Sequence, residues 1–392
     1  MIRPAAIALV LATIAAALAS AACLGPAPQC DDGFDTVAAG FCVRATPLAL
    51  AESRAYAKLV TFDGGALAVG GYDGGPQLFS AAVERFDLAA ASFSPGPTLP
   101  GPRITSDAID LGARGALVFG GRDDAQTALR APVLLEPGAL DWRTLPELPA
   151  GHAAGTATHL GDRVLFIGGI DGPIPAADAS AAVSVLDLAT MTATAATPLP
   201  GPRLSHAAIA PADGSVLVVG GDDDGTLGAY EDNLGDAVLL EADGVTWTLL
   251  PGMAVPRYHP ALAPLLDGRI LVIGGAPESV PGPATEICDP VTRTFEAGPE
   301  IERRGPGVSA ISVGDHVIVL GGDRDDERYL VTVIHLSTLQ VTELPAADGL
   351  RARYGGTAAV AVAPGTFLLE GLSDDEISVF ALYEVVFPTG LL

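Results

Sequence analysis

Positive charge is scarce in this sequence, and lysine is almost absent. The 392 residues include 21 lysines and arginines, of which Lys58 is the single lysine, against 47 aspartates and glutamates. The net charge is −26 and the pI is near 4.3. Phosphate repulsion would oppose binding to nucleic acid or to an anionic lipid surface. The charge therefore excludes those partners and favours cations or basic partners.

Motifs of several enzyme classes are also missing. The chain has no H-E-x-x-H zinc helix, no G-x-S-x-G nucleophile elbow, no Walker loop and no dinucleotide fingerprint. Charged residues make up only 17%, whereas hydrophobic residues reach 49%. The 47 glycines and 32 prolines are typical of many short strands joined by tight turns.

One sequence motif recurs along the chain: four apolar residues followed by a glycine pair. Such runs are typical of strands buried on both faces, and paired glycines allow a close approach of the backbone. Copies lie 47 to 54 residues apart, a spacing that indicates radial repetition. The first glycine of each copy, replaced by glutamate in the last, is Gly70, Gly120, Gly168, Gly220, Gly274, Gly321 and Glu370.

A basic residue precedes each of these positions by 16 or 17 residues. It is an arginine in six units and His152 in the third. An aromatic residue often follows the glycines, as Phe93, Trp142, Trp247 and Phe295 do. These marks together resemble the kelch repeat, whose usual order is Pro-Arg-x-x-His, a strand, Gly-Gly-x-Asp-Gly, a strand and Trp. Residues 203–206 (Arg-Leu-Ser-His) and 220–223 (Gly-Gly-Asp-Asp) fit it best.

The resemblance to the kelch and galactose oxidase-type propellers implies an all-β, seven-bladed β-propeller with four antiparallel strands per blade. We assign residues 48–392 to this single domain. Two ways of closing the ring remain open at this point. Residues 377–380 and 383–387 can supply the last two strands of the seventh unit, or residues 41–43 can donate a closing strand.

The N-terminus has the pattern of an export signal. Arg3 precedes an alanine-rich apolar run that ends in small residues, so residues 1–22 are predicted to be a signal peptide. Residues 20–23 (Ser-Ala-Ala-Cys) resemble a bacterial lipobox, which makes Cys23 a candidate for lipidation; residues 19–21 (Ala-Ser-Ala) offer an ordinary cleavage site instead. We expect an exported protein that is either lipid-anchored in the cell envelope, at the outer membrane, or secreted.

The cysteines agree with export. Cys30 and Cys42 bound a short loop and are predicted to form a disulfide that staples a small N-terminal segment, residues 23–47. Cys288 lies in a strand-like run and is expected to be buried and inert. Because Cys288 has no evident tyrosine partner, we do not expect the copper site of the galactose oxidases, and no cofactor is predicted.

The repeat order places a candidate binding surface on one face of the ring. The arginine precedes the first strand of each unit and the acidic turn follows the second, so both emerge on the same face. In the functional interpretation, the arginines line a binding site for a carboxylate, a sugar acid or an acidic peptide. In the structural interpretation, each arginine pairs with a carboxylate of its own or a neighbouring blade. The candidates are Arg54, Arg103, Arg203, Arg257, Arg304, Arg353, His206 and His259.

Metal ligands are a weaker alternative. The acidic turns offer hard oxygen ligands for calcium, but neither follows the ligand order of a known calcium loop. The calcium candidates are Asp222, Asp224, Asp323 and Asp325.

We therefore predict a monomeric binding or scaffold protein of the cell envelope that recognises a protein or a carbohydrate. The alternative is an enzyme acting on a sugar or sugar acid, similar to the epimerases and oxidases built on this fold. Unpaired arginine, histidine or tyrosine in a deep central pocket favours the enzyme, and neutralised arginines favour the scaffold.

Overall fold

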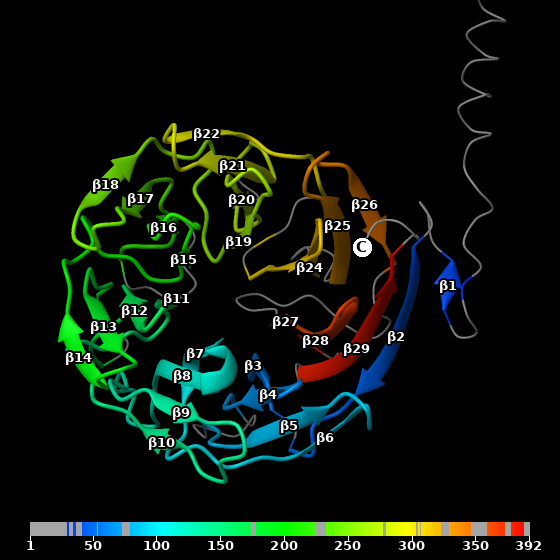
Figure 1. The fold of residues 1–392 in the computed structure, drawn as a ribbon, viewed down its shortest axis with the longest axis horizontal. Helices are drawn as coiled ribbons and strands as arrows, with labels where there is room; N and C mark the ends of the chain where they lie inside the picture. The colour runs from blue at the N-terminus through cyan, green and yellow to red at the C-terminus, as the bar shows by residue number, and fades with distance from the viewer. Residues whose placement is uncertain are drawn as a thin grey trace, which may run out of the picture.

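The chain forms a closed ring of seven antiparallel sheets (Figure 1), which confirms the all-β, seven-bladed propeller predicted from the repeat. The computed structural model describes residues 30, 34–36, 41–52, 54–72, 79–173, 178–224, 233–276, 280–302, 305, 307–322, 329–345, 359–372 and 378–387. None of these residues forms a helix of the length and apolarity needed to cross a bilayer.

In blades 1 to 6 the strands follow the chain order, with the first strand beside the central axis and the last strand at the rim. Blade 1 contains β3 (Lys58–Phe62), β4 (Gly65–Val69), β5 (Val83–Asp87) and β6 (Ser92–Pro95). Blade 2 contains β7 (Ile104–Asp110), β8 (Ala116–Arg122), β9 (Val133–Leu135) and β10 (Arg143–Thr144), with the 3-10 helix η3 (Gly112–Arg114) between its first two strands. Blade 3 contains β11 (Thr156–Leu160), β12 (Arg163–Ile167), β13 (Val183–Asp187) and β14 (Thr192–Ala195).

The remaining blades continue the ring. Blade 4 contains β15 (Ala207–Ile209), β16 (Val216–Val219), β17 (Ala237–Leu240) and β18 (Trp247–Leu250). Blade 5 contains β19 (Ala261–Pro264), β20 (Ile270–Ile273), β21 (Thr285–Asp289) and β22 (Thr294–Ala297). Blade 6 contains β23 (Ser309–Val313), β24 (His316–Gly322), β25 (Tyr329–His335) and β26 (Val341–Leu344). Blade 7 contains β27 (Ala359–Ala363), β28 (Thr366–Leu372), β29 (Ser378–Val386), β2 (Cys42–Leu48) and β1 (Asp35–Thr36).

The hydrophobic core is divided among the junctions between blades. The second strand of each blade is buried on both faces, as its four apolar residues predict. Blades 1 and 2, for example, share a cluster in which Val60 and Leu67 pack with Val118 and Val133. Equivalent clusters lie at each of the other junctions around the ring. Each blade is therefore stabilised only by its two neighbours.

The first glycine of the pair is required by this packing. Gly120 and Gly220 have φ of +58° and +63°. A Cβ at Gly120 would lie 2.4 Å from His152 O, and one at Gly220 would lie 2.3 Å from Arg257 O. A side chain is thus excluded both by the backbone conformation and by the carbonyl of the next blade.

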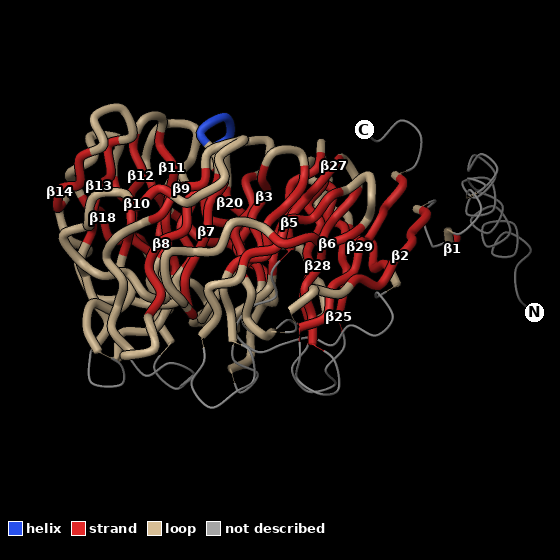
Figure 2. Tube along the Cα trace, turned by 90° about the horizontal axis from the view of Figure 1, so that it is seen from below, coloured by secondary structure: helices blue, strands red, loops and turns tan. Residues whose placement is uncertain are grey.

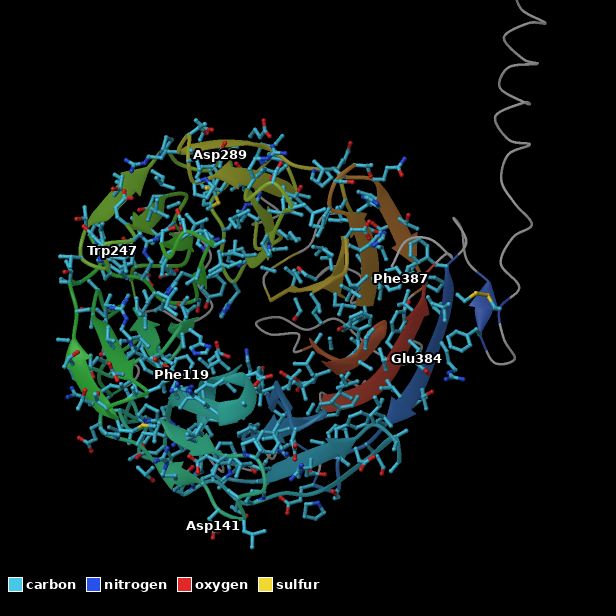
Figure 3. The ribbon with its side chains drawn as sticks, viewed as in Figure 1. Phe119, Asp141, Trp247, Asp289, Glu384 and Phe387 are labelled. Atoms are coloured by element: carbon cyan, nitrogen blue, oxygen red, sulfur yellow. A yellow bond between two sulfur atoms is a disulfide. The ribbon has the colours of Figure 1, made fainter. Side chains whose placement is uncertain are left out.

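The ring is closed by strands from the two ends of the chain. β2 pairs with β29 in antiparallel register from Cys42–Val386 to Leu48–Phe380. Arg44 lies opposite Glu384, which is labelled in Figure 3. The two side chains form a bidentate ion pair, with Arg44 Nε 2.5 Å from Glu384 Oε2 and Nη2 2.7 Å from Glu384 Oε1. Of the two closures left open by the sequence, the structure therefore has the N-terminal strand as the fourth strand of blade 7.

The short N-terminal segment is tied to this closing strand. Cys30 and Cys42 form a disulfide with Cα atoms 5.8 Å apart, and β1 pairs with the start of β2. Because β2 lies within blade 7, the propeller includes residues 42–48 and begins earlier than the boundary at residue 48 that the repeat suggested. Cys23 and the signal segment lie outside the described residues. Cys288 is buried in β21, with its thiol pKa raised to about 12 by desolvation.

The two faces of the ring differ in their connections. We call the face at which the second strands end in their glycine pairs the loop face. The opposite face, which carries η3 and tight turns such as the one at Asp63 and Gly64, is the turn face (Figure 2, top). Antiparallel strand order places the start of every first strand at the loop face, beside the glycine pairs, as the sequence analysis expected.

A chain that begins at Ala49 lacks the closing strand and should fail to give a monomer with one cooperative thermal transition, because β29 becomes an exposed edge strand. A control chain that begins at Phe41 keeps β2 and loses β1 and the disulfide, the disulfide accounting for about 3 kcal/mol. Size-exclusion chromatography and thermal unfolding followed by circular dichroism measure both. Equal cooperativity in the two chains would contradict closure by β2.

Candidate functional site

Three of the predicted ligand arginines are buried inside their own blades. Each guanidinium donates to the carbonyl of the first glycine of its blade and to a carboxylate on, or next to, the third strand. The glycine distances are Arg54 Nε–Gly70 O 2.8 Å, Arg203 Nη1–Gly220 O 3.0 Å and Arg257 Nη1–Gly274 O 2.7 Å. The carboxylate distances are Arg54 Nη1–Glu84 Oε1 2.7 Å, Arg203 Nη2–Asp236 Oδ2 3.0 Å and Arg257 Nη2–Glu286 Oε1 3.0 Å.

For these three arginines the contacts favour the structural interpretation, arginine–carboxylate pairing, over a ligand-binding surface. Arg54 and Arg257 are 2% and 0% exposed, and Arg203 is equally buried. Because their guanidinium groups are held by acids of the same blade, they fix the end of the blade and are not available to a ligand. Arg304 and Arg353 lie outside the described residues.

His152 fills the same place in blade 3 with a neutral version of the same arrangement. Its Nδ1 donates to Gly168 O at 2.7 Å, and its Nε2 accepts from the Ser184 hydroxyl at 2.9 Å. Ser184 stands opposite the second-strand residue Phe166, at the register position that Glu84 and Glu286 have in blades 1 and 5. Desolvation lowers the pKa of His152 to about 4. A neutral imidazole is therefore matched with a hydroxyl instead of a carboxylate.

Arg103 is the exception among the described arginines of this set. It is 4% exposed, yet among the described residues its Nε and Nη1 have no hydrogen-bond partner. The register position that carries the acid in blades 1 and 5 is Val133 in blade 2. Desolvation lowers the pKa of Arg103 to about 10. Blade 2 thus keeps the buried cation and lacks its carboxylate.

The two candidate histidines lie beside the central channel at the loop face. His206 Nε2 lies 2.8 Å from Thr156 Oγ1, and its Nδ1 has no partner among the described residues. Desolvation lowers the pKa of His206 well below its usual value and that of His259 to about 4, so both are neutral at pH 7. The ring of His259 packs edge-on against Tyr258 at 4.7 Å.

A belt of backbone hydrogen bonds positions these histidines. Ser205 N donates to Ala154 O at 2.8 Å, His259 N to Ser205 O at 2.8 Å, and Gly307 N to His259 O at 3.0 Å. Ala154, Ser205 and His259 all have positive φ, between 48° and 55°. The left-handed backbone turns each carbonyl toward the next blade, so the belt links blades 3 to 6 around the channel. His259 therefore has a structural role in its backbone, whatever its side chain binds.

The acidic turns do not assemble a calcium site in the part of the chain that the structure describes. Asp222 is fully buried, its Oδ1 accepts from Asp224 N at 2.9 Å, and desolvation raises its pKa to about 6. Asp222 and Asp224 do not bring three acidic or histidine ligands together. Asp323 and Asp325 lie outside the described residues.

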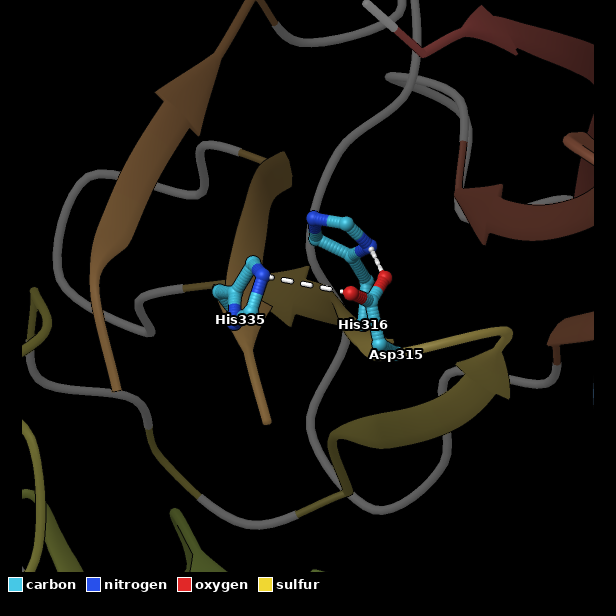
Figure 4. A group of neighbouring side chains, drawn as sticks. All are labelled: Asp315, His316 and His335. Carbon is cyan, nitrogen blue, oxygen red and sulfur yellow. Dashed lines mark ion pairs between the residues drawn. The ribbon is translucent and has the colours of Figure 1, made fainter. Parts of the chain in front are cut away.

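Sequence reasoning missed a cluster of Asp315, His316 and His335 at the turn face of blade 6 (Figure 4). Asp315 Oδ1 lies 2.7 Å from His316 Nδ1, and Asp315 Oδ2 lies 3.2 Å from His335 Nε2. His316 in β24 and His335 in β25 are paired in the sheet register. Aligning the repeats could have predicted this pairing, but no sequence motif includes the two histidines.

The hydrogen bonds of His335 argue against metal binding by this cluster. His335 Nδ1 faces the backbone N–H groups of Ser337 and Thr338 at 3.3 Å and 3.4 Å, so it accepts. The ring proton is then on Nε2, which points at Asp315. A metal ion would need that Nε2 lone pair, with a proton on Nδ1 facing two other donors. The protonation of His335 therefore fits a structural contact with Asp315 better than a metal site.

A cavity of about 620 Å³ opens on the turn face of blade 1, away from the candidates. Its cation, Arg85, is already engaged: Nη2 lies 3.0 Å from Asp63 Oδ2, and the guanidinium lies 5.1 Å from the Phe62 ring centroid. This cavity therefore has no unpaired cation to offer.

Replacing Arg257 by Met should lower the free energy of unfolding by about 3–5 kcal/mol, because Glu286 is left as a buried carboxylate without its partner. The matched substitution Arg103→Met removes a buried charge that has no acid, so its cost should be much smaller. Urea denaturation measures both values. Equal losses would show that Arg103 is paired as Arg257 is.

Comparison with known proteins adds no family assignment. No protein-family model matches the chain, and no curated protein matches it. What is established is a seven-bladed β-propeller whose loop face carries one buried arginine without a partner acid among the described residues.

Proposed function

We propose that this protein is an exported, lipid-anchored binding module of the cell envelope, whose loop face recognises a protein or a carbohydrate. The observation that carries the proposal is the set of buried arginine–acid pairs in blades 1, 4 and 5. They hold the glycine ends of the blades in fixed positions. Connections between such fixed ends are a usual place for recognition.

The state of the basic residues favours binding over catalysis. Arg54, Arg203 and Arg257 are neutralised by acids of their own blades, as expected for a scaffold, whereas Arg103 has no such acid among the described residues. His152 is likewise satisfied by a carbonyl and a hydroxyl. The kelch-like order of marks in the sequence supports the same proposal, because it implies a rigid propeller scaffold, and binding residues are commonly found on loops that such scaffolds position.

Membrane attachment rests on the lipobox-like residues 20–23 and the preceding apolar segment. A lipid on Cys23 would anchor the propeller through its N-terminal segment, next to the strand that closes the ring. We expect mass spectrometry of the membrane-extracted protein to find an N-terminal lipopeptide beginning at Cys23, and Cys23→Ala to release the protein from the membrane fraction. A mature N-terminus elsewhere, or an unmodified Cys23, would refute the anchor.

Recognition by the loop face is tested by blocking each face in turn. A cysteine is introduced at exposed Ala125 on the loop face or at exposed Leu266 on the turn face, and a polyethylene glycol chain is attached. Cys288 is buried and should not react in the folded protein. We expect the chain at residue 125 to abolish binding to immobilised envelope protein or polysaccharide, and the one at 266 to leave it unchanged. The reverse pattern would refute the proposal.

A further inference from the structure

Blade 2 differs from blades 1, 3 and 5 at one repeated position. The position is on the third strand, facing the second-strand residue that lies two places before the glycine pair. Blades 1 and 5 have Glu84 and Glu286 at this position, and blade 3 has Ser184. Blade 2 has Val133 there. Blade 4 has an apolar residue too, but supplies Asp236 two residues earlier, where blade 2 has Ala131. Neither place in blade 2 can neutralise the arginine.

The backbone of Arg103 is held against blade 1 by two hydrogen bonds. Arg103 N donates to Ser80 O at 3.3 Å, and Arg103 O accepts from Gly71 N at 3.4 Å, which holds it against blade 1. Its side chain is almost fully buried, with Nε and Nη1 lacking any acceptor among the described residues. A buried donor without an acceptor costs free energy, and a charged one costs more. An external anion would remove that cost.

A second guanidinium reaches the same part of blade 1. Arg122 is the register partner of Ile104, the residue after Arg103. Its guanidinium lies 5.8 Å from the centroid of Phe79, the residue before Ser80. Its Nε is buried without an acceptor in the described part of the chain, and desolvation lowers its pKa. Arg103 therefore contacts the Phe79–Ser80 segment through its backbone, and Arg122 contacts it through its guanidinium. Neither guanidinium has an ion pair among the described residues, and the nearby Asp124 carboxylate accepts from Phe79 N at 3.1 Å.

We propose that Arg103 and Arg122 form an anion site at the loop-face junction of blades 1 and 2 that binds the carboxylate of a sugar acid. The proposal rests on the proposed binding function and names the group that the loop face would recognise. The choice of a carboxylate follows from the neighbouring blades, where the equivalent guanidinium is satisfied by the carboxylates of Glu84, Asp236 and Glu286. The ligand would supply in blade 2 the partner that the chain supplies elsewhere, with the planar match of guanidinium to carboxylate.

The site is tested with sodium D-galacturonate, and with D-galactose as the neutral control, on the purified mature protein at constant ionic strength. Isothermal titration and the ligand-dependent shift in Tm both report binding. We expect galacturonate to bind and galactose not to. Arg122→Met should weaken binding about tenfold or more, the loss expected for a charge-assisted hydrogen bond.

Two further variants separate loss of the site from loss of the fold, because one removes the cation and the other adds an internal acid. Arg103→Met removes the cation, whereas Val133→Glu restores the acid of blades 1 and 5 and should neutralise Arg103 internally. Both should abolish galacturonate binding while the thermal transition stays cooperative. Unchanged binding in the folded Val133→Glu variant, no binding by the natural chain, or equal binding of galactose would each overturn the proposal. Equal binding of sulfate would also overturn it, by showing general anion attraction.

This experiment is separate from the one on the proposed function. Galacturonate binding is measured on the isolated protein, whereas the loop-face block is scored on envelope components. A natural chain that binds no galacturonate, but loses its envelope partner when residue 125 is blocked, refutes the site and keeps the function. Galacturonate binding without any loop-face partner refutes the envelope function and keeps the site.

Discussion

The structure depends on packing between neighbouring blades. Each second strand is apolar on both faces, so a single blade cannot bury its own surface and needs a blade on either side. An open array would leave two such faces in water. Pairing of β2 with β29 joins the two ends of the chain in one sheet, so the ring is closed and neither face is left exposed to water. The disulfide between Cys30 and Cys42 attaches the N-terminal segment to this same strand.

Arginine has an architectural role in this ring. In blades 1, 4 and 5 its guanidinium joins the start of the first strand, the end of the second and the third strand's acid. Blade 3 does the same with His152 and Ser184. The change of cation is accompanied by a change of partner, which keeps the buried charge balanced. Because cation and partner change together in these blades, the arginine of blade 2, which has no partner acid among the described residues, is a candidate for binding an external anion.

The proposed binding of an anion depends on the buried hydrogen-bond donors that the repeat leaves without an acceptor. A protein with a net charge of −26 that keeps a buried, unpaired cation concentrates its attraction for anions in one small region. The acidic surroundings also weaken nonspecific attraction of larger anions. Selective recognition of a single carboxylate group on an uncharged or weakly charged ligand is consistent with both properties.

The sequence by itself determined the architecture of the propeller. Glycine pairs, apolar runs and upstream basic residues recur at a fixed spacing, and each reflects a local requirement: positive φ, two-sided burial and a strand start. The same order placed the arginines and the glycine pairs on one face. These features are readable because their physical causes lie within one repeat.

Only the tertiary structure decided which side chains are available. Glu84 lies 30 residues after Arg54 and is not near it in any motif, so the pairing needs the register of the third strand. For the same reason the sequence left ligand binding and structural pairing both open for Arg54, Arg203 and Arg257, and did not distinguish Arg103. It could not choose the closing strand, because β2 and β29 lie at opposite ends of the chain and their pairing is a long-range contact.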